Sequence, residues 1–280
     1  MKKTNDIIAF QGVPGSYSEL ACRSVYPAME TLSCPSFEEA MVAVRESRAT
    51  YAMLPVENSI AGRVADIHHL LPEGGLSIVG EHFQRVVHHL LVVPGATMQD
   101  IKTVRSHIQA LTQCRKFIRS QKYQPQSWGD TASAAKDVAA LGDKSIAAIG
   151  SSLSGEIYGL ESLRGDIADL AGNTTRFFIM AREAAPPRPG TFCITTLLFR
   201  VRSVPAALYK ALGGFATCGV NLTRIESYLV DGRFDAAQFL VDVEGHPEDR
   251  PLRLALEELA FFASEVKVIG TYPGHPFRRD

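Results

Sequence analysis

The chain has 280 residues, of which 46% are hydrophobic and 21% are charged, and its formal net charge at pH 7 is -1. A single hydrophobic core rarely grows beyond roughly 250–300 residues, so we expect two or three subdomains. This composition excludes a disordered chain. The near-neutral charge, without long runs of like charge, gives no indication of a nucleic-acid or membrane partner.

Cysteine usage and hydropathy indicate the compartment. The five cysteines show no C-x-x-C spacing, so we interpret them as free thiols in a reducing environment. No apolar stretch reaches the length of a secretory or transmembrane segment, which predicts a cytoplasmic protein. The adjacent pairs His68-His69 and His88-His89 do not share one face of a helix or strand, so we expect no metal site.

Strand-like and helix-like patterns alternate up to about residue 181. Apolar runs predict strands at 7–11, 51–56, 89–93, 123–127 and 145–149, and amphipathic runs predict helices at 16–26, 37–45, 109–120 and 132–141. Such alternation predicts an α/β fold of parallel sheets covered by helices. Ligands of these sheets bind in the crevice at the carboxyl ends of the strands, so functional residues are expected there.

A different pattern follows the segment 184–190, whose three prolines and one glycine predict a linker. We expect Gly219 to end the first helix beyond it, and Asp231-Gly232 to form a turn. The predicted order is strand 192–201, helix 206–217, strand 221–229, strand 234–243, helix 252–262 and strand 266–272. This βαββαβ order predicts a ferredoxin-like unit.

The loop Gly12-Val13-Pro14-Gly15-Ser16 follows the first strand and opens a helix. Glycines let the backbone approach a ligand closely. Ser16 is suited to cap the helix, whose N-terminal N–H groups favour an anion. An ordinary strand–helix turn is the alternative. The loop lacks the lysine of a phosphate-binding loop, so nucleotide binding is not indicated.

Polar residues also stand at the borders of two other predicted elements. Glu57 and Asn58 follow a strand, where they are suited either to orient a small polar ligand or to form a turn. Ser106 is the predicted N-cap of the helix that contains Gln109 and Gln113. These two glutamines share one helix face, which suits a carboxylate ligand or a solvated surface.

Two more groups stand at element ends. Asp130 or Thr131 is the predicted N-cap of the next helix, which suits an anion or serves the helix alone. Thr175 and Arg176 lead into an apolar strand that contains Phe177. A guanidinium suits bidentate binding of a substrate carboxylate or of a protein carboxylate. A hydroxyl passes a proton if its neighbours support it.

Together these motifs resemble those of the prephenate dehydratase family. The residues that carry the resemblance are Gly12–Ser18, Pro55–Ser59, Ser106-His107 with Gln109 and Gln113, and Thr175–Phe177. The resemblance implies a catalytic region built like a type II periplasmic binding protein, in which two α/β lobes flank a cleft. It also implies no cofactor and no metal.

The reaction that the resemblance implies is the decarboxylating dehydration of prephenate to phenylpyruvate in L-phenylalanine biosynthesis, a carbon–oxygen lyase reaction. Thr175 is then the expected proton donor to the departing hydroxyl group. Ile108 departs from the family pattern, which has a proline there. The other expected catalytic residues are Asn58, Ser106 and Gln113, and the expected substrate-binding residues are Glu57, Ser16, Thr131, Arg176 and Phe177.

The tail resembles an ACT domain, a small amino-acid-binding module, which implies allosteric feedback inhibition by L-phenylalanine. Two departures, Ala206 for a glycine and Tyr228-Leu229 for Arg-Pro, leave the effector's identity open. A dimerisation unit without a ligand is the alternative. The expected effector-binding residues are Ala206, Ala207, Leu208, Asn221, Leu222, Glu226 and Ser227.

The resemblance also implies the domain bounds and the partners. Expected are a catalytic domain at 5–182 (lobe 1 about 5–80 and 166–182, lobe 2 about 81–165), a linker at 183–190 and an ACT domain at 191–275. ACT domains commonly pair side by side, so a homodimer or homotetramer is expected. The alternatives are an arogenate dehydratase, which takes an amino acid in place of the keto acid, and a non-catalytic small-ligand-binding sensor of the same fold.

Overall fold

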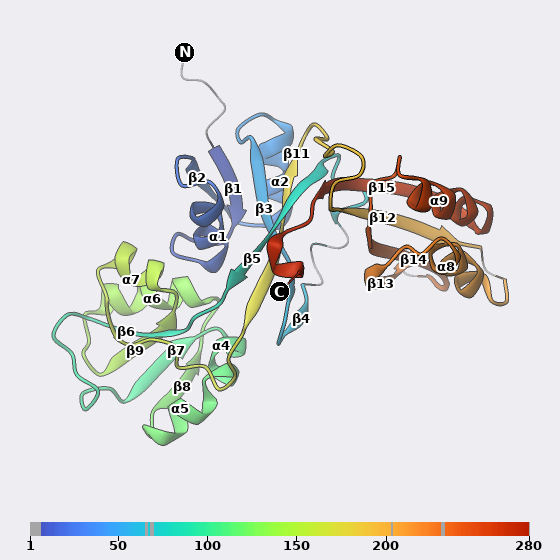
Figure 1. Ribbon diagram of the computed structural model, residues 1–280. Coiled ribbons are helices and arrows are strands. Elements are labelled where there is room, and N and C mark those ends of the chain that lie inside the picture. The colour runs from blue at the N-terminus through green and yellow to red at the C-terminus, as the bar shows by residue number, and fades with distance from the viewer. Residues whose placement is uncertain (1–6, 65–66, 68–69, 203, 231–232, 280) are drawn as a thin grey trace, which may run out of the picture. The chain divides into compact units, whose positions relative to one another are not determined.

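The computed structural model describes residues 7–64, 67, 70–202, 204–230 and 233–279. The chain divides into two compact units, Met1–Ile67 with His82–Phe177 and His68–Glu81 with Phe178–Asp280. Strands and helices alternate through most of the chain, so the predicted α/β fold class is confirmed (Figure 1).

One sheet begins in the first unit. Its elements and their connections are β1 Ile7–Gln11, α1 Tyr17–Val25, β2 Glu30–Cys34, α2 Phe37–Arg45, β3 Tyr51–Asn58, β4 Gly62–Arg63, β5 Ser77–Arg85 and β11 Thr174–Ala181. The strand order is β2-β1-β3-β11-β5, with β4 paired to β3. β1 is parallel to both β2 and β3, as a strand–helix–strand path requires.

A second sheet belongs wholly to the first unit. Its elements are β6 His89–Val92, β7 Thr103–Ser106, α4 Ile108–Gln113, α5 Arg115–Ser120, β8 Gln124–Ser127, α6 Thr131–Leu141, β9 Ile146–Gly150, α7 Ser152–Tyr158 and β10 Glu161–Arg164. The strand order is β10-β6-β9-β7-β8. This sheet is mixed rather than parallel as predicted, because β6 pairs antiparallel with both β9 and β10. Buried apolar side chains such as Leu91, Val104, Val138 and Ile149 form the core that holds the helices on this sheet.

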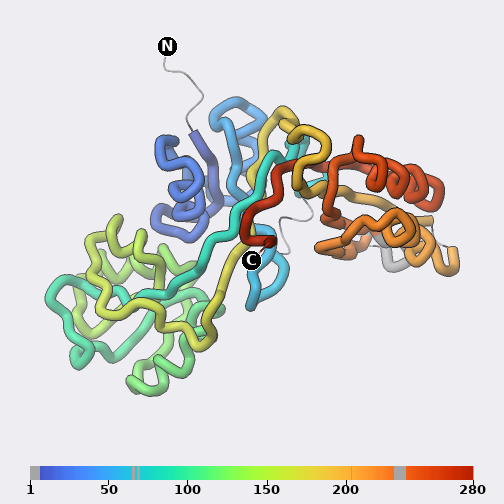
Figure 2. Tube along the Cα trace, in the orientation of Figure 1, coloured from blue at the N-terminus to red at the C-terminus, as the bar shows by residue number. Residues whose placement is uncertain are grey.

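Two segments carry the chain between these sheets, one leaving β5 and one entering β11 (Figure 2). They are hydrogen-bonded to each other. The Val86 N–H donates to the Asn173 carbonyl at 2.8 Å, and the Ile167 N–H donates to the His88 carbonyl at 3.2 Å. This double crossing brings residues from distant parts of the sequence to the space between the sheets.

The tail of the second unit has the predicted βαββαβ order. Its elements are β12 Cys193–Val201, α8 Ala207–Thr217, β13 Leu222–Val230, β14 Arg233–Glu244, α9 Arg250–Phe262 and β15 Ala263–Pro273. The antiparallel sheet has the order β13-β14-β12-β15. Gly219 follows α8 with φ +67°, so its predicted role at the helix end is confirmed. The predicted turn at Asp231-Gly232 lies outside the described residues.

The helix predicted at 109–120 is wrong in two respects. It is two helices, α4 and α5, because Cys114 between them leaves helical geometry with φ -110° and ψ 16°. The N-cap of α4 is His107, whose Nδ1 accepts from the Gln109 N–H at 3.3 Å. Ser106 is instead the last residue of β7. It is fully buried and donates its hydroxyl to the Ile149 carbonyl at 2.6 Å.

Several short elements have no sequence signal. The strands β2 and β10, with sequences ETLSC and ESLR, are edge strands with mostly polar, partly exposed residues. Sheet pairing rather than apolar alternation defines such strands.

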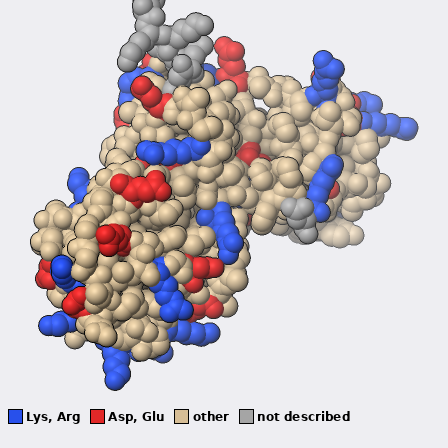
Figure 3. Space-filling model, turned by 60° about the vertical axis from the view of Figure 1, so that its left-hand side comes forward, with Lys and Arg blue, Asp and Glu red and all other residues tan. Residues whose placement is uncertain are grey.

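On the face drawn in Figure 3, acidic and basic side chains are interspersed. Among the described residues, no helix combines the length and the apolar character that crossing a membrane requires.

Candidate active site

A cavity of about 670 Å³ lies in the first unit, with walls from both of its sheets. The ends of β1 and β3 and the starts of α1, α6 and β11 all contribute, which agrees with ligand binding at the carboxyl ends of strands. Its polar lining side chains are Gln11, Ser16, Tyr17, Ser18, Asn58, Arg63, His88, His107, Gln109, Gln113, Asp130, Thr131, Asn173 and Thr175.

The loop between β1 and α1 approaches the start of helix α7 closely. Gly15 has φ +89°, and a Cβ there would lie 2.9 Å from the Cα of Ser154. Its carbonyl accepts from the hydroxyls of Ser151 and Ser154, at 2.6 and 2.8 Å. Only glycine satisfies both the backbone angle and the space. The loop is thereby fixed, and Ser16 caps α1 by accepting from the Glu19 N–H at 3.3 Å.

Asn58, at the end of β3, links two loops to β11. Its Oδ1 accepts from the N–H groups of Ile60 and Ala61 at 3.0 and 2.8 Å. Its Nδ2 donates to the Thr175 Oγ1 at 2.9 Å and to the Asn173 Oδ1 at 2.7 Å. The Thr175 hydroxyl oxygen is therefore an acceptor within the protein, at the wall of the cavity.

The hydrogen bonds continue from Asn173 into the second sheet. Asn173 Nδ2 donates to the Gln113 Oε1 at 3.0 Å, and His88 Nε2 lies 2.8 Å from the same oxygen. The other nitrogen of His88 is 2.9 Å from the Tyr17 hydroxyl. Burial lowers the pKa of His88, although the bond to Gln113 opposes this, and burial raises the pKa of Tyr17. Both effects favour the uncharged forms.

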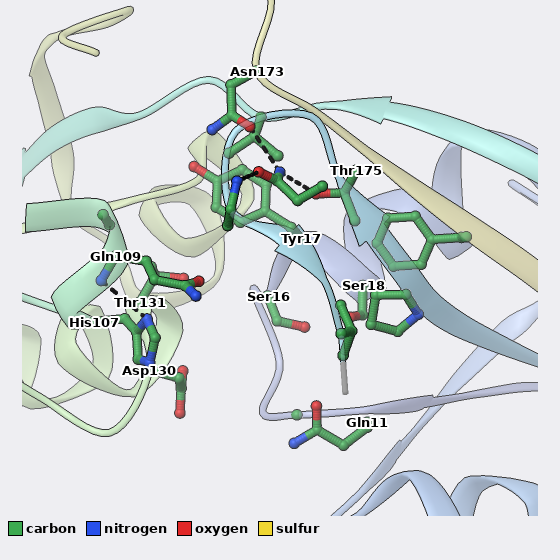
Figure 4. Close-up of a pocket in the computed structure, with 18 of the residues that line it drawn as sticks. Gln11, Ser16, Tyr17, Ser18, His107, Gln109, Asp130, Thr131, Asn173 and Thr175 are labelled. Carbon is green, nitrogen blue, oxygen red and sulfur yellow. Dashed lines mark hydrogen bonds between the residues drawn. The ribbon is translucent and has the colours of Figure 1, made fainter. Parts of the chain in front are cut away.

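The opposite wall of the cavity is also polar. His107, Gln109, Asp130 and Thr131 lie together in Figure 4, across from Tyr17, Asn173 and Thr175. Asp130 caps α6, because its Oδ1 accepts from the N–H groups of Ala132 and Ser133 at 2.9 and 2.8 Å. The predicted cap is therefore Asp130 rather than Thr131, which is the first residue of the helix.

Arg176 contacts a protein carboxylate. It is 2% exposed, and its Nη1 donates to the Glu57 Oε1 at 2.9 Å. Its guanidinium also lies over the Phe83 ring at 5.9 Å. Of the two alternatives for Arg176, the structure thus contains the protein carboxylate. This pair, in which Arg176 is buried and Glu57 is half-buried, joins β3 to β11.

The structure brings most of the predicted catalytic and substrate-binding residues to one cavity. Those that line it are Ser16, Asn58, Gln113, Thr131, Thr175 and Phe177. Those that do not are Glu57 and Arg176, which pair with each other, and Ser106, whose buried hydroxyl binds a main-chain carbonyl of β9.

Sequence reasoning missed His88, Asn173 and Arg63 as lining residues. His88 precedes the predicted strand at 89–93, and it was interpreted only as one member of an adjacent histidine pair. Only the double crossing of the chain reveals that it faces Gln113. Among the described residues, no three His, Cys, Asp or Glu side chains gather in a way that would hold a metal ion.

The expected effector-binding residues lie in two segments of the second unit. Ala206 is the N-cap of α8, and Ala207 and Leu208 form its first turn. Asn221 precedes β13, and its carbonyl accepts from the Glu244 N–H at 3.0 Å. The remaining residues lie on β13 and are Leu222, Glu226 and Ser227.

The chain is similar to a known protein family and to several named proteins. A family model described as prephenate dehydratase matches residues 8–185. A bifunctional N-acyl-homoserine lactone acylase/prephenate dehydratase of Komagataeibacter europaeus is 54% identical, over 98% of each chain. Arogenate dehydratase/prephenate dehydratase 1 of Arabidopsis thaliana is 39% identical over 95% of this chain and 71% of its own length.

A solved structure is similar along nearly the whole chain. It is a prephenate dehydratase from Arthrobacter aurescens in complex with L-Phe, with a TM-score of 0.88 and 29% sequence identity. The match covers 96% of this chain and 90% of that one.

Proposed function

The chain belongs to the prephenate dehydratase family, an enzyme family of carbon–oxygen lyases, and from this premise we propose that it converts prephenate to phenylpyruvate. In this reaction the bond to the ring carboxylate breaks and carbon dioxide leaves. The electron pair moves into the ring, and the ring hydroxyl departs with a proton as water. Aromatisation of the ring provides the driving force.

Thr175 is the proposed proton donor to the departing hydroxyl. The observation that supports this role is the hydrogen bond from Asn58 Nδ2 to the Thr175 Oγ1, at 2.9 Å. Because the oxygen accepts from Asn58, the hydroxyl proton is available to a ligand in the cavity. The same N–H stabilises negative charge that develops on the oxygen when the proton leaves.

The remaining cavity residues are proposed to hold the substrate. Ser16 and Thr131 stand at the N-termini of α1 and α6, where their hydroxyls are placed to donate to the carboxylates of prephenate. Gln113 orients the substrate together with Asn58, and Phe177 forms an apolar wall. Glu57 and Arg176 are assigned a bracing role because they pair with each other.

The catalytic region and the tail are proposed to have the family's two modules. The sheet orders of the first unit and its double crossing support a two-lobed region like a type II periplasmic binding protein. The βαββαβ order and the sheet order β13-β14-β12-β15 support an ACT domain. We propose L-phenylalanine as its inhibitory effector, which the similarity to the Arthrobacter aurescens protein in complex with L-Phe supports.

The decisive experiment follows phenylpyruvate formation from prephenate by the purified full chain, with and without L-phenylalanine. Turnover that phenylalanine suppresses would support both proposals. Turnover that stays the same with and without phenylalanine would contradict the effector proposal alone.

Parallel assays use arogenate and an N-acyl-homoserine lactone, since relatives carry these activities in their names. A well-folded protein that converts arogenate alone would be an arogenate dehydratase. Conversion of the lactone alone would overturn the proposed reaction.

A further inference from the structure

We propose that His88 is a positioning residue that holds the Gln113 and Asn173 amides in the orientation that supports Asn58, the hydrogen-bond partner of the Thr175 hydroxyl. Its effect is to hold the Asn58 nitrogen firmly beside Thr175, which keeps the hydroxyl proton available to the cavity. The inference rests on the proposed function, because it acts on the group assigned as proton donor. It concerns a buried imidazole that the proposed reaction itself does not use.

The direction of these bonds starts at Asn58. An amide oxygen accepts and an amide nitrogen donates, and the two are distinguished by their partners. Main-chain N–H groups of Ile60 and Ala61 point to one end of this amide, at 3.0 and 2.8 Å. That end is therefore the oxygen, and the nitrogen faces Asn173 and Thr175.

Each following bond has only one possible direction. The Asn173 atom that receives the Asn58 N–H is its oxygen, so the Asn173 nitrogen donates to Gln113 at 3.0 Å. The Gln113 atom that receives this bond is also an oxygen. His88 Nε2, 2.8 Å from that oxygen, must then carry a hydrogen and donate it.

The other side of the imidazole agrees with this assignment. Burial disfavours the charged ring and lowers the pKa of His88, so a neutral ring with Nε2–H leaves Nδ1 as an acceptor. The Tyr17 hydroxyl lies 2.9 Å from Nδ1 and 2.8 Å from the Val87 carbonyl, so its one hydrogen is shared between these two acceptors and can be directed at Nδ1 in this tautomer. The two rings meet edge to face, with centroids 5.7 Å apart, which holds the imidazole in place.

His88 consequently prevents the Gln113 amide from reversing. If Nδ1 carried the hydrogen instead, two acceptors would face each other between His88 and Gln113. Reversing Gln113 would then set two donors against each other at Asn173. Since main-chain groups fix Asn58, the conflict cannot be relieved there. Either the bond between Asn173 and Gln113 or the bond from Asn58 to Asn173 would be lost, and the Asn58 nitrogen would be held less firmly beside Thr175.

The first test reads the tautomer directly. Two-bond proton–nitrogen correlation spectra of the ¹⁵N-labelled full chain, assigned by comparison with His88→Gln, distinguish Nε2–H from Nδ1–H. We expect Nε2–H. An Nδ1–H tautomer would overturn the inference whatever the turnover. Wild-type protein that converts neither prephenate nor arogenate would overturn the proposed function, and the spectra would still decide the tautomer.

The second test uses substitutions and separates kcat from KM. His88→Leu removes the donor to Gln113, and we expect kcat to fall about tenfold with KM changed much less, since roughly one hydrogen bond of orientation is lost. His88→Gln offers an amide oxygen to Tyr17 and an amide nitrogen to Gln113, so it should restore most of kcat.

The matched control is His89→Leu. This neighbour lies on β6 and binds the Ser162 hydroxyl at 2.9 Å, outside the cavity lining. We expect its kcat to stay within about twofold. Equal losses in His88→Leu and His88→Gln would mean that the ring only fills space, and an unchanged kcat in His88→Leu would likewise overturn the inference.

Discussion

The Thr175 hydroxyl combines two features that a proton donor requires. It lines the cavity, and its oxygen accepts from Asn58. We predict that Thr175→Val lowers kcat by roughly 10²–10⁴, the usual contribution of general acid catalysis, because the isosteric methyl group has no proton to give.

The neighbouring Thr174 provides the control for this prediction. It lies on the same strand, but its hydroxyl donates to the Gly172 carbonyl at 3.1 Å. Thr174→Val should leave kcat within about threefold. Steady-state assays on both variants test the assignment, and a near-normal rate in Thr175→Val would remove Thr175 from the donor role.

The five cysteines differ in burial, which predicts their reactivity. Desolvation by burial raises the pKa of the Cys114 thiol to about 12 and that of Cys193 to about 11, whereas Cys218 is only half-buried. The thiolate is the reactive form. We expect iodoacetamide at pH 8 to modify Cys218 first and Cys114 only after denaturation, as followed by peptide mass spectrometry. Labelling should accelerate as pH rises, and equal rates for both thiols would contradict the burial of Cys114.

At the scale of an element, the backbone at the start of α8 is strained. Ala206 adopts the left-handed conformation, with φ 62° and ψ 17°, and makes no side-chain cap bond. This conformation costs a residue with a Cβ about 1 kcal/mol or more relative to glycine. We predict that Ala206→Gly raises the free energy of unfolding by about 1 kcal/mol in denaturant titrations.

The adjacent Ala207 is the matched control, because it lies inside the first turn of the same helix. There a glycine is unfavourable, so Ala207→Gly should lower the free energy of unfolding by about 1 kcal/mol or more. Changes of the same sign in both variants would contradict the left-handed conformation at Ala206.

At the scale of the whole molecule, an ion pair joins distant segments of the second unit. Glu81 is buried at the end of the segment 68–81, and the Arg278 guanidinium donates to both its oxygens at 2.6 and 2.9 Å. The His275 N–H donates to the same carboxylate at 3.0 Å. The C-terminal residues are thereby tied to a segment about 200 positions earlier in the sequence.

Removing one charge of this pair should destabilise the protein. We predict that Glu81→Gln lowers the free energy of unfolding by about 3 kcal/mol, because the Arg278 charge loses its partner. The double variant Glu81→Leu with Arg278→Met should recover much of this loss, since an apolar pair needs no counter-charge. Calorimetry measures the free energy of unfolding of both variants. An unchanged value in Glu81→Gln would show that the ion pair contributes little to stability.

The local pattern of the sequence was sufficient for the long elements. The helix at 37–45 agrees residue for residue with α2, because Ser36 caps it and its buried face recurs at helical spacing. The βαββαβ order of the tail was predicted because its apolar residues also recur at helix or strand spacing. Edge strands such as β2 were missed, since pairing with a neighbour defines them and their side chains stay partly exposed.

The amino-acid sequence alone predicts the alternation of strands and helices, the family to which the motifs point and the polar residues at strand ends. Which of those residues meet depends on how the whole chain folds. Asn58, His88, Gln113 and Thr175 lie in separate parts of the chain and become neighbours because the chain crosses twice between two sheets. Ser106 was expected at a helix N-cap near the ligand. Because it is instead the last residue of β7, its hydroxyl donates to a main-chain carbonyl of β9. Periodicity acts over one turn or one strand, whereas hydrogen-bond partners are selected by the packing of whole elements.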